Sequence, residues 1–183
     1  MKKILTILAD GFEEIEALTP VDILRRGGVE VATVGMTGRT VMGSHGIPVV
    51  ADLLPDEVGS DFEMLVFPGG LPGSDNLNAS PYTDKLLADA EACGAHVAAI
   101  CAAPYLLGRR GLLRGLKATS YPAEKFRAQL LGAEITDERV VTDGRFTTAA
   151  GMGVSAAFAL RLLSILRGEE TARSIGDAAL ITP

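Results

Sequence analysis

The chain has 183 residues, with 17 lysine plus arginine and 23 aspartate plus glutamate, so its formal net charge is −6 at pH 7. Hydrophobic residues make up 48% and charged residues 22%, an ordinary globular composition that excludes a disordered or fibrous protein. The acidic balance and the lack of a basic run argue against nucleic acid or an anionic membrane as a partner. We expect a single domain over residues 1–183, with a core that needs no disulfide or metal.

The N-terminal stretch MKKILTILA combines two lysines with an apolar run, as a signal peptide does. Asp10 breaks this run early, so we expect an opening β-strand instead. The chain contains no run of about 18 apolar residues, which excludes a membrane-spanning helix. With no export signal, Cys93 and Cys101 are expected to be free thiols in a cytoplasmic protein.

Along the chain, short apolar runs alternate with segments whose apolar residues recur at helical spacing. Strands are expected at 3–9, 29–34, 64–67, 96–100, 140–141 and 146–149, with a short hairpin or an excursion at the sheet edge at 41–51. Helices are expected at 13–26, 81–93, 104–107 and 153–166, and again near the C-terminus before a short tail. In 13–26, Ile15, Leu18 and Val21 recur every three residues, which predicts an amphipathic helix with a kink at Pro20.

Strands that alternate with helices predict a parallel sheet covered on both faces. The strands at 64–67 and 97–100 are apolar throughout, which is typical of strands buried on both sides. We therefore expect a flavodoxin-like, doubly wound α/β fold with a mainly parallel sheet. In such sheets ligands bind at the carboxyl ends of the strands, so the residues after each strand are the candidates for a site.

Cys101 follows the strand expected at 96–100 and precedes two alanines and Pro104, near which a helix begins. This is the arrangement of a nucleophile elbow, a tight strand-to-helix turn that exposes a reactive side chain. The partial positive charge of a helix N-terminus favours a thiolate, so we expect a lowered pKa for Cys101. The alternative is that Cys101 is one more small buried hydrophobic residue. Cys93, near a helix end, is expected to be structural or merely exposed.

Three glutamates follow the first strand. Glu13 and Glu14 are expected to be solvated residues that complement the dipole of the helix. Glu16 lies farther into the helix, flanked by apolar residues, and is the one expected to be partly desolvated. A desolvated carboxyl has a raised pKa and can move a proton near neutral pH.

Gly69 and Gly70 follow the strand at 64–67 and allow a backbone to approach a ligand closely. The amide of Gly70 is a candidate donor to an oxyanion, and the alternative is a plain turn. The GMG stretch at 151–153 resembles a dinucleotide-binding loop only superficially, because it lacks the acidic partner of that motif. No Walker A, G-x-S-x-G, H-E-x-x-H or C-x-x-C motif occurs, and with two distant histidines we expect no metal site.

Four stretches occur in order along nearly the whole chain: ILADGFEEIEALTPVDILRRGG, LVFPGG, AAICAAP and TTAAGMGVSAAFAL. Together they closely resemble the DJ-1/ThiJ/PfpI superfamily, in its Parkinson-protein branch of deglycases and glyoxalases III. By matching position, the resemblance implies that Cys101 is the reactive cysteine and Glu16 its partner. It also implies that Gly70 and Ala102 supply backbone donors to an oxyanion. A flavodoxin-like fold, a homodimer and a glutamate that stabilises the sulfinic form of the cysteine are implied as well.

The sequence departs from the wider superfamily at two positions. Peptidase-type members place a histidine directly after the cysteine, where this chain has Ala102, so proteolysis is disfavoured. Some relatives have a histidine before the proline that follows the next strand, where this chain has Tyr121. Acid–base chemistry is therefore expected to rest on Glu16, with Tyr121 either donating a hydrogen bond or simply packing.

The two histidines have different expected roles. His45 lies in an excursion that, in the family, packs at the dimer interface beside the partner's active site, and the alternative is an exposed loop histidine. His96 lies at the start of a strand and is expected to be structural.

The first functional hypothesis is a cofactor-independent glyoxalase or deglycase that acts on α-oxoaldehydes such as methylglyoxal. Cys101 would attack the aldehyde, and Glu16 would move a proton between the two adjacent carbons. The second is a dimeric redox sensor or chaperone-like protective protein in which Cys101 is oxidised. A third, another cysteine-dependent hydrolase or hydratase for a small molecule, uses the same atoms.

Overall fold

The computed structural model describes residues 3–181 and contains a central sheet of six strands in the order β2-β1-β5-β6-β10-β9. Neighbouring strands are parallel except for β9, which runs antiparallel to β10 at one edge. The mainly parallel sheet that the sequence predicts is confirmed. The strands of this sheet are β1 (Lys3–Leu8), β2 (Val31–Gly35), β5 (Phe62–Phe67), β6 (His96–Ile100), β9 (Val140–Asp143) and β10 (Phe146–Ala149).

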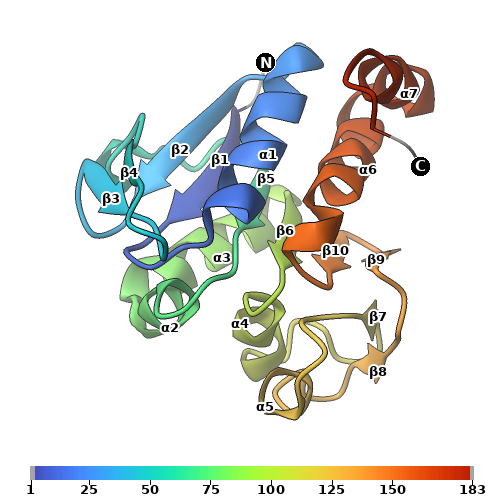
Figure 1. Ribbon diagram of the computed structural model, residues 1–183. Coiled ribbons are helices and arrows are strands. Elements are labelled where there is room, and N and C mark those ends of the chain that lie inside the picture. Colours follow the sequence, from blue (N-terminus) through green and yellow to red (C-terminus); the bar gives the residue numbers. More distant parts are fainter. Residues whose placement is uncertain (1–2, 182–183) are drawn as a thin grey trace.

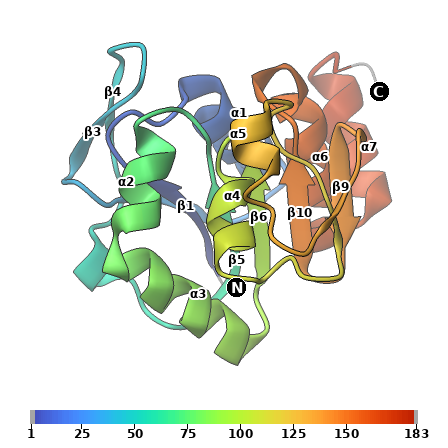
Figure 2. The same cartoon turned by 90° about the horizontal axis from the view of Figure 1, so that it is seen from below.

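Helices cover both faces of the sheet (Figures 1 and 2). The helices are α1 (Glu14–Arg26), α2 (Gly73–Ala79), α3 (Pro81–Cys93), α4 (Pro104–Arg109), α5 (Glu124–Arg127), α6 (Ser155–Arg167) and α7 (Glu169–Ala178). Successive residues of β5 alternate between the two faces. Met64 and Val66 belong to the core under α1 and α6, whereas Leu65 and Phe67 belong to the core under α3 and α4. This double burial explains the uninterrupted apolar sequence of the strand.

Two small two-stranded sheets lie outside the central sheet. The expected hairpin is confirmed as β3 (Thr40–Met42) paired antiparallel with β4 (Pro48–Val50). The second sheet pairs β7 (Lys117–Ala118) with β8 (Glu134–Ile135). The sequence pattern does not predict β7, β8, α2 or α5, because elements of two to seven residues span too few positions to show a period.

The burial of α1 differs from the expected amphipathic pattern. Ile15 and Leu18 are exposed, with 50% and 37% of their surface accessible, whereas Glu14 and Glu16 are buried. Val21 is buried as expected, and Pro20 lies within the helix, which continues to Arg26. The first turn of α1 therefore points carboxylates inward and apolar side chains outward, against the usual distribution.

Within residues 3–181 no helix is long and apolar enough to cross a bilayer. Met1 and Lys2 of the MKKILTILA stretch, and the last two residues of the expected C-terminal tail, lie outside the described residues.

Candidate functional site

Cys101 occupies the expected turn between β6 and α4, at the carboxyl end of the sheet. Its backbone has φ of +64°, a left-handed conformation that non-glycine residues adopt rarely and at a cost of about 1–3 kcal/mol. The Cys101 N–H donates to the carbonyl of Ala149 at 2.8 Å, and the Cys101 carbonyl accepts from the Tyr121 N–H at 2.8 Å. These bonds hold the turn, which has the strained geometry of a nucleophile elbow.

Glu16 projects from the first turn of α1 and is 1% exposed. Its Oε2 accepts a hydrogen bond from the Gly69 N–H at 2.9 Å. Its Oε1 is buried and makes no hydrogen bond of standard geometry within residues 3–181. The carboxylate of Glu13 caps the helix by accepting from the Glu16 N–H at 2.7 Å, which fixes the backbone from which Glu16 projects.

Gly69 brings Glu16 and Cys101 together. A Cβ added to Gly69 would lie 2.6 Å from Glu16 Oε2 and 2.7 Å from Cys101 Cβ, both too close for a carbon atom. Only glycine therefore fits between the carboxyl and the thiol-bearing residue. The carboxyl of Glu16 and the thiol of Cys101 are close enough that each shifts the pKa of the other.

Burial raises the pKa of Glu16 to about 7, although hydrogen bonding to the Cys101 thiol opposes this shift. Burial and the charge of Glu16 raise the pKa of Cys101 to about 12. The lowered pKa expected for Cys101 is therefore wrong, because burial and the charge of Glu16 raise the pKa of this thiol. Once Glu16 has ionised, near neutral pH, one proton remains on the pair and lies on the Cys101 thiol. A thiolate forms when this proton passes from the thiol to Glu16.

The two backbone donors predicted for an oxyanion lie at the thiol. The backbone N–H groups of Gly70 and Ala102 lie near the Cys101 sulfur, and both act to lower the pKa of the thiol. Gly70 has φ of +89°, and a Cβ on it would lie 2.4 Å from the backbone nitrogen of Glu13. Because no side chain fits there, Gly70 keeps its amide beside the sulfur.

Tyr121 is joined to the site through its backbone. Its ring packs edge-on against Phe126, with 6.1 Å between ring centroids, as the packing alternative predicts. A Cβ added to Gly151 would lie 3.6 Å from the Tyr121 ring and 4.0 Å from Cys101 Sγ. Gly151 is a site residue that the sequence reasoning discounts, although it follows the carboxyl end of β10, where ligand-contacting residues are expected.

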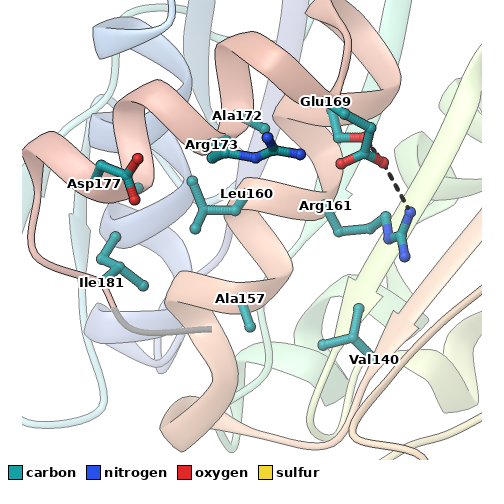
Figure 3. Close-up of a pocket in the computed structure, with 11 residues that line it drawn as sticks. Val140, Ala157, Leu160, Arg161, Glu169, Ala172, Arg173, Asp177 and Ile181 are labelled. Carbon is teal, nitrogen blue, oxygen red and sulfur yellow. Dashed lines mark hydrogen bonds and ion pairs between the residues drawn. The ribbon is translucent and has the colours of Figure 1, made fainter.

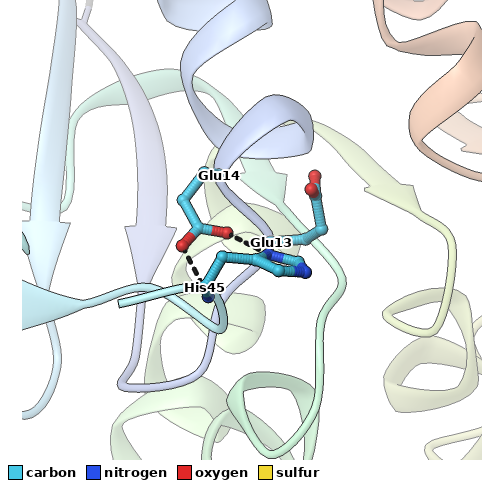
Figure 4. A group of neighbouring side chains, drawn as sticks. All are labelled: Glu13, Glu14 and His45. Carbon is cyan, nitrogen blue, oxygen red and sulfur yellow. Dashed lines mark hydrogen bonds and ion pairs between the residues drawn. The ribbon is translucent and has the colours of Figure 1, made fainter. Parts of the chain in front are cut away.

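His45 does not reach Cys101 of its own chain but binds Glu14 (Figure 4). Its Nδ1 lies 2.9 Å from Glu14 Oε2, and its backbone N–H donates to Glu14 Oε1 at 2.7 Å. Although burial opposes the shift, these hydrogen bonds lower the pKa of Glu14 to about 2, and the carboxylate in turn raises the pKa of His45. The pair fastens the loop between β3 and β4 to the start of α1.

The expectation that Glu13 and Glu14 are solvated is wrong. Both are buried, Glu13 as the cap of α1 and Glu14 as the acceptor for the β3–β4 loop. Ligand atoms of Glu13, Glu14 and His45 lie within 4.8 Å of one another, a spacing that suits a metal ion. Their hydrogen bonds already use one Glu13 oxygen, both Glu14 oxygens and His45 Nδ1, so the cluster is complete as an ion pair.

The remaining cysteine and histidine lie away from these groups. His96 Nε2 lies 2.9 Å from Thr147 Oγ1, and burial together with the charge of Arg145 lowers its pKa to about 4. Cys93 is a free thiol whose sulfur makes only long contacts, 3.7 Å to the carbonyl of Phe62. Both have the structural environment expected from the sequence.

Two of the pockets on the described part of the chain differ in size and in lining residues. The larger, about 590 Å³, lies between α6 and α7 and includes none of the predicted site residues (Figure 3). The smaller has a volume of about 410 Å³, and its lining includes Tyr121 and Gly151. These two residues are distant from Cys101 in the sequence but lie beside it in the fold. The size of a pocket is therefore a poor guide to the site in this fold.

Comparison with known proteins identifies relatives along nearly the whole chain. The model of the DJ-1/PfpI family matches residues 2–165. Protein dj-1beta of Drosophila melanogaster is 36% identical over 98% of this chain and 97% of its own length. A deglycase of Thermococcus kodakarensis is 36% identical over 90% of this chain and 99% of its own length. The solved structure of oxidized Toxoplasma gondii DJ-1 has a TM-score of 0.90 and 33% identity, with 100% of both chains covered.

Proposed function

The chain belongs to the DJ-1/PfpI family, and from this premise we propose that it is a cofactor-independent glyoxalase or deglycase acting on α-oxoaldehydes such as methylglyoxal. The observation that carries the proposal is the buried carboxyl of Glu16 beside the thiol of Cys101, with a pKa of about 7. A carboxyl of this pKa accepts and returns a proton near neutral pH. The deglycase among the relatives supports an enzymatic role.

The reaction begins when the Cys101 proton passes to Glu16 and the thiolate adds to the aldehyde carbon. The carbonyl oxygen becomes an alkoxide beside the N–H groups of Gly70 and Ala102, which lie near the sulfur and favour negative charge there. Protonation of this oxygen gives a hemithioacetal. Glu16 is the base that this step requires, because it is the carboxyl packed against Cys101 across Gly69.

In the second stage Glu16 removes the proton from the former aldehyde carbon and returns it to the adjacent carbon, while the hydroxyl proton of the hemithioacetal passes to the oxygen on that adjacent carbon. This transfer converts the hemithioacetal into a thioester of a 2-hydroxy acid, with no net gain or loss of electrons. One water molecule then cleaves the thioester, which releases the acid and restores the thiol. For methylglyoxal the product is lactate.

The test compares the purified protein with Cys101→Ser and Cys93→Ser variants and measures lactate formed from methylglyoxal. We expect the Cys101 variant to fall to background and the Cys93 variant to match the wild type, because Cys93 lies outside the site. A Cys101→Ser protein that makes as much lactate as the wild type would rule out the mechanism.

A second candidate function is redox sensing, favoured by the buried Oε1 of Glu16, which makes no hydrogen bond of standard geometry within residues 3–181. If Cys101 is oxidised to a sulfinate, a protonated Glu16 can donate a hydrogen bond to the new oxygen. Under mild peroxide we expect mass spectrometry to detect oxygen on Cys101 before Cys93. Prior oxidation of Cys93 would exclude this role.

The acting unit is proposed to be a homodimer. Exposed apolar side chains gather near the N-terminal end of α1: Ile15 and Leu18 on the helix, and Ile47 in the β3–β4 loop that His45 fastens to it. An apolar surface of this kind on a folded protein marks an interaction site. A cytoplasmic location, where Cys93 and Cys101 stay reduced, remains part of the proposal.

A further inference from the structure

The smaller pocket is lined by neighbours of Cys101 and Glu16 and not by these two residues themselves. Gly151 lines the pocket, and a Cβ added to Gly151 would lie 4.0 Å from the Cys101 sulfur. Met152 also lines it, and its backbone N–H lies close enough to Glu16 to form a hydrogen bond that lowers the pKa of that carboxyl. A molecule whose aldehyde reaches Cys101 therefore has this pocket of about 410 Å³ as space for the rest of its chain.

Two arginines line the pocket, Arg127 from the end of α5 and Arg139 from the segment just before β9. Arg127 Nη2 pairs with Asp137 Oδ1 at 2.8 Å, and Asp137 is the pocket's carboxylate. The Nε of Arg127 is buried and has no hydrogen-bond partner within residues 3–181. The guanidinium of Arg139 is in no ion pair or side-chain hydrogen bond with the described residues, and its Nη2 lies 3.7 Å from where a Gly153 Cβ would be.

The charges in the pocket sum to one excess positive charge, in a chain whose formal net charge is −6. A guanidinium binds a carboxylate through two parallel hydrogen bonds, and such charge-assisted bonds are stronger than neutral ones. A single excess positive charge matches a carboxylate, which carries one negative charge, better than a phosphate, which carries nearly two at neutral pH.

We propose that this pocket binds the carboxylate of the substrate through Arg139, so that the substrate class is an α-oxoaldehyde with a carboxylate at its far end. The inference rests on the proposed function for the reaction and adds the substrate class. Arg139 is a specificity-determining residue, and Arg127, paired with Asp137, also lines the pocket. The reaction balances as before: 4,5-dioxopentanoate and one water give 2-hydroxyglutarate, with no external oxidant or reductant.

The first experiment measures kcat/KM for two substrates of equal chain length, 4,5-dioxopentanoate and the uncharged 2-oxopentanal. We expect Arg139→Gln to lower kcat/KM for 4,5-dioxopentanoate, relative to kcat/KM for 2-oxopentanal, by about tenfold or more. The reason is that a charge-assisted hydrogen bond to the carboxylate is lost. Arg173→Gln is the matched control, since Arg173 is also an exposed arginine but lies at the other pocket. An unchanged ratio in Arg139→Gln, or an equal fall in Arg173→Gln, would overturn the proposal.

The second experiment separates the pocket from the reaction. Calorimetry measures binding of 4-oxopentanoate, which keeps the carboxylate but has no aldehyde, to the wild type and Arg139→Gln. Binding to the wild type with at least about tenfold weaker binding to the variant supports the carboxylate site even if no dicarbonyl is converted, in which case only the proposed function fails. No binding to the wild type, or equal binding to both, would overturn the carboxylate site whatever the turnover.

Discussion

Glu16 and Cys101 meet across the Cα of Gly69, where a Cβ would lie 2.6 Å from the Glu16 carboxylate and 2.7 Å from Cys101 Cβ. The two residues are 85 positions apart in the chain and reach the same point because β1, β5 and β6 are neighbours in one parallel sheet. Their closeness makes each the main polar neighbour that perturbs the other: the charge of Glu16 raises the pKa of Cys101, and the thiol lowers that of Glu16.

The pair predicts a specific pH dependence of the proposed activity. Below pH 7 Glu16 is protonated and the site lacks a base, so kcat/KM should rise as pH passes through about 7. The Glu16→Gln variant should show no rise of kcat/KM near pH 7. Its kcat/KM should also be lower than that of the wild type by about 100-fold or more. The measurement is a pH profile of lactate formation, with the exposed Glu30→Gln as control. A profile that keeps its step near pH 7 in Glu16→Gln would contradict the assignment.

The same carboxyl should affect stability in the opposite sense. The pKa of Glu16 is raised from 4.5 to about 7, so the folded state holds its proton more tightly than the unfolded state. The stability contribution is then complete below pH 4.5 and is lost as pH rises through 7, by about 3 kcal/mol at most. We expect Glu16→Gln to be more stable than the wild type at pH 8 in urea unfolding. Equal stability at pH 8 would show that burial of the charge costs little.

Gly69→Ala tests whether close approach at the site depends on glycine. The new methyl group would collide with Glu16 and Cys101, so we expect a loss of about 1–3 kcal/mol in unfolding free energy. The proposed activity should fall as well, because the carboxyl and thiol are pushed apart. Gly59→Ala is the control, since a Cβ there meets no atom within 4 Å. Equal unfolding midpoints for the two variants would show that the backbone at Gly69 yields easily.

Much of this arrangement follows from sequence patterns. Strands and helices that alternate predict the sheet, and the rule that ligands bind at strand ends leads to Cys101 and Gly70. Glu16 follows from its apolar flanks. Burial of Glu14 does not follow, because it depends on the β3–β4 loop, whose Ser44 and His45 supply the hydrogen bonds. Local periodicity contains no information about such a loop.

The pKa of Cys101 and the pocket arginines show a second limit. A helix start after Cys101 is visible in the sequence, but the opposing charge of Glu16 comes from a different part of the chain. Arg127 and Arg139 lie on a four-residue helix and an irregular segment, which have no period that would place them together. That both arginines line one pocket is a property of the tertiary structure.

The pKa values of the two histidines should be shifted in opposite directions from the usual value. Hydrogen bonding to Glu14 raises the pKa of His45 above its usual 6.5, whereas burial lowers that of His96 to about 4. Because the pKa of His45 is raised, its ion pair stabilises the fold below pH 6.5, and this contribution is lost as pH rises through the higher value. NMR titration of the ring protons should detect both shifts. Glu14→Gln should return His45 toward 6.5 and leave His96 unchanged, and a His45 pKa that stays raised would contradict the pairing.

The outward apolar side chains of α1 predict self-association. Ile15 is 50% exposed and lies one turn from Leu18 on the same face of the helix, so burial against a second copy would remove both from water. We expect light scattering to give the mass of two chains for the wild type and of one chain for Ile15→Glu, which would bury a charge at the contact. Leu131→Glu is the control, because Leu131 is 51% exposed but lies in the segment after α5. A monomeric wild type would show that the chain forms no dimer. An Ile15→Glu protein that stays dimeric would show that the interface lies elsewhere.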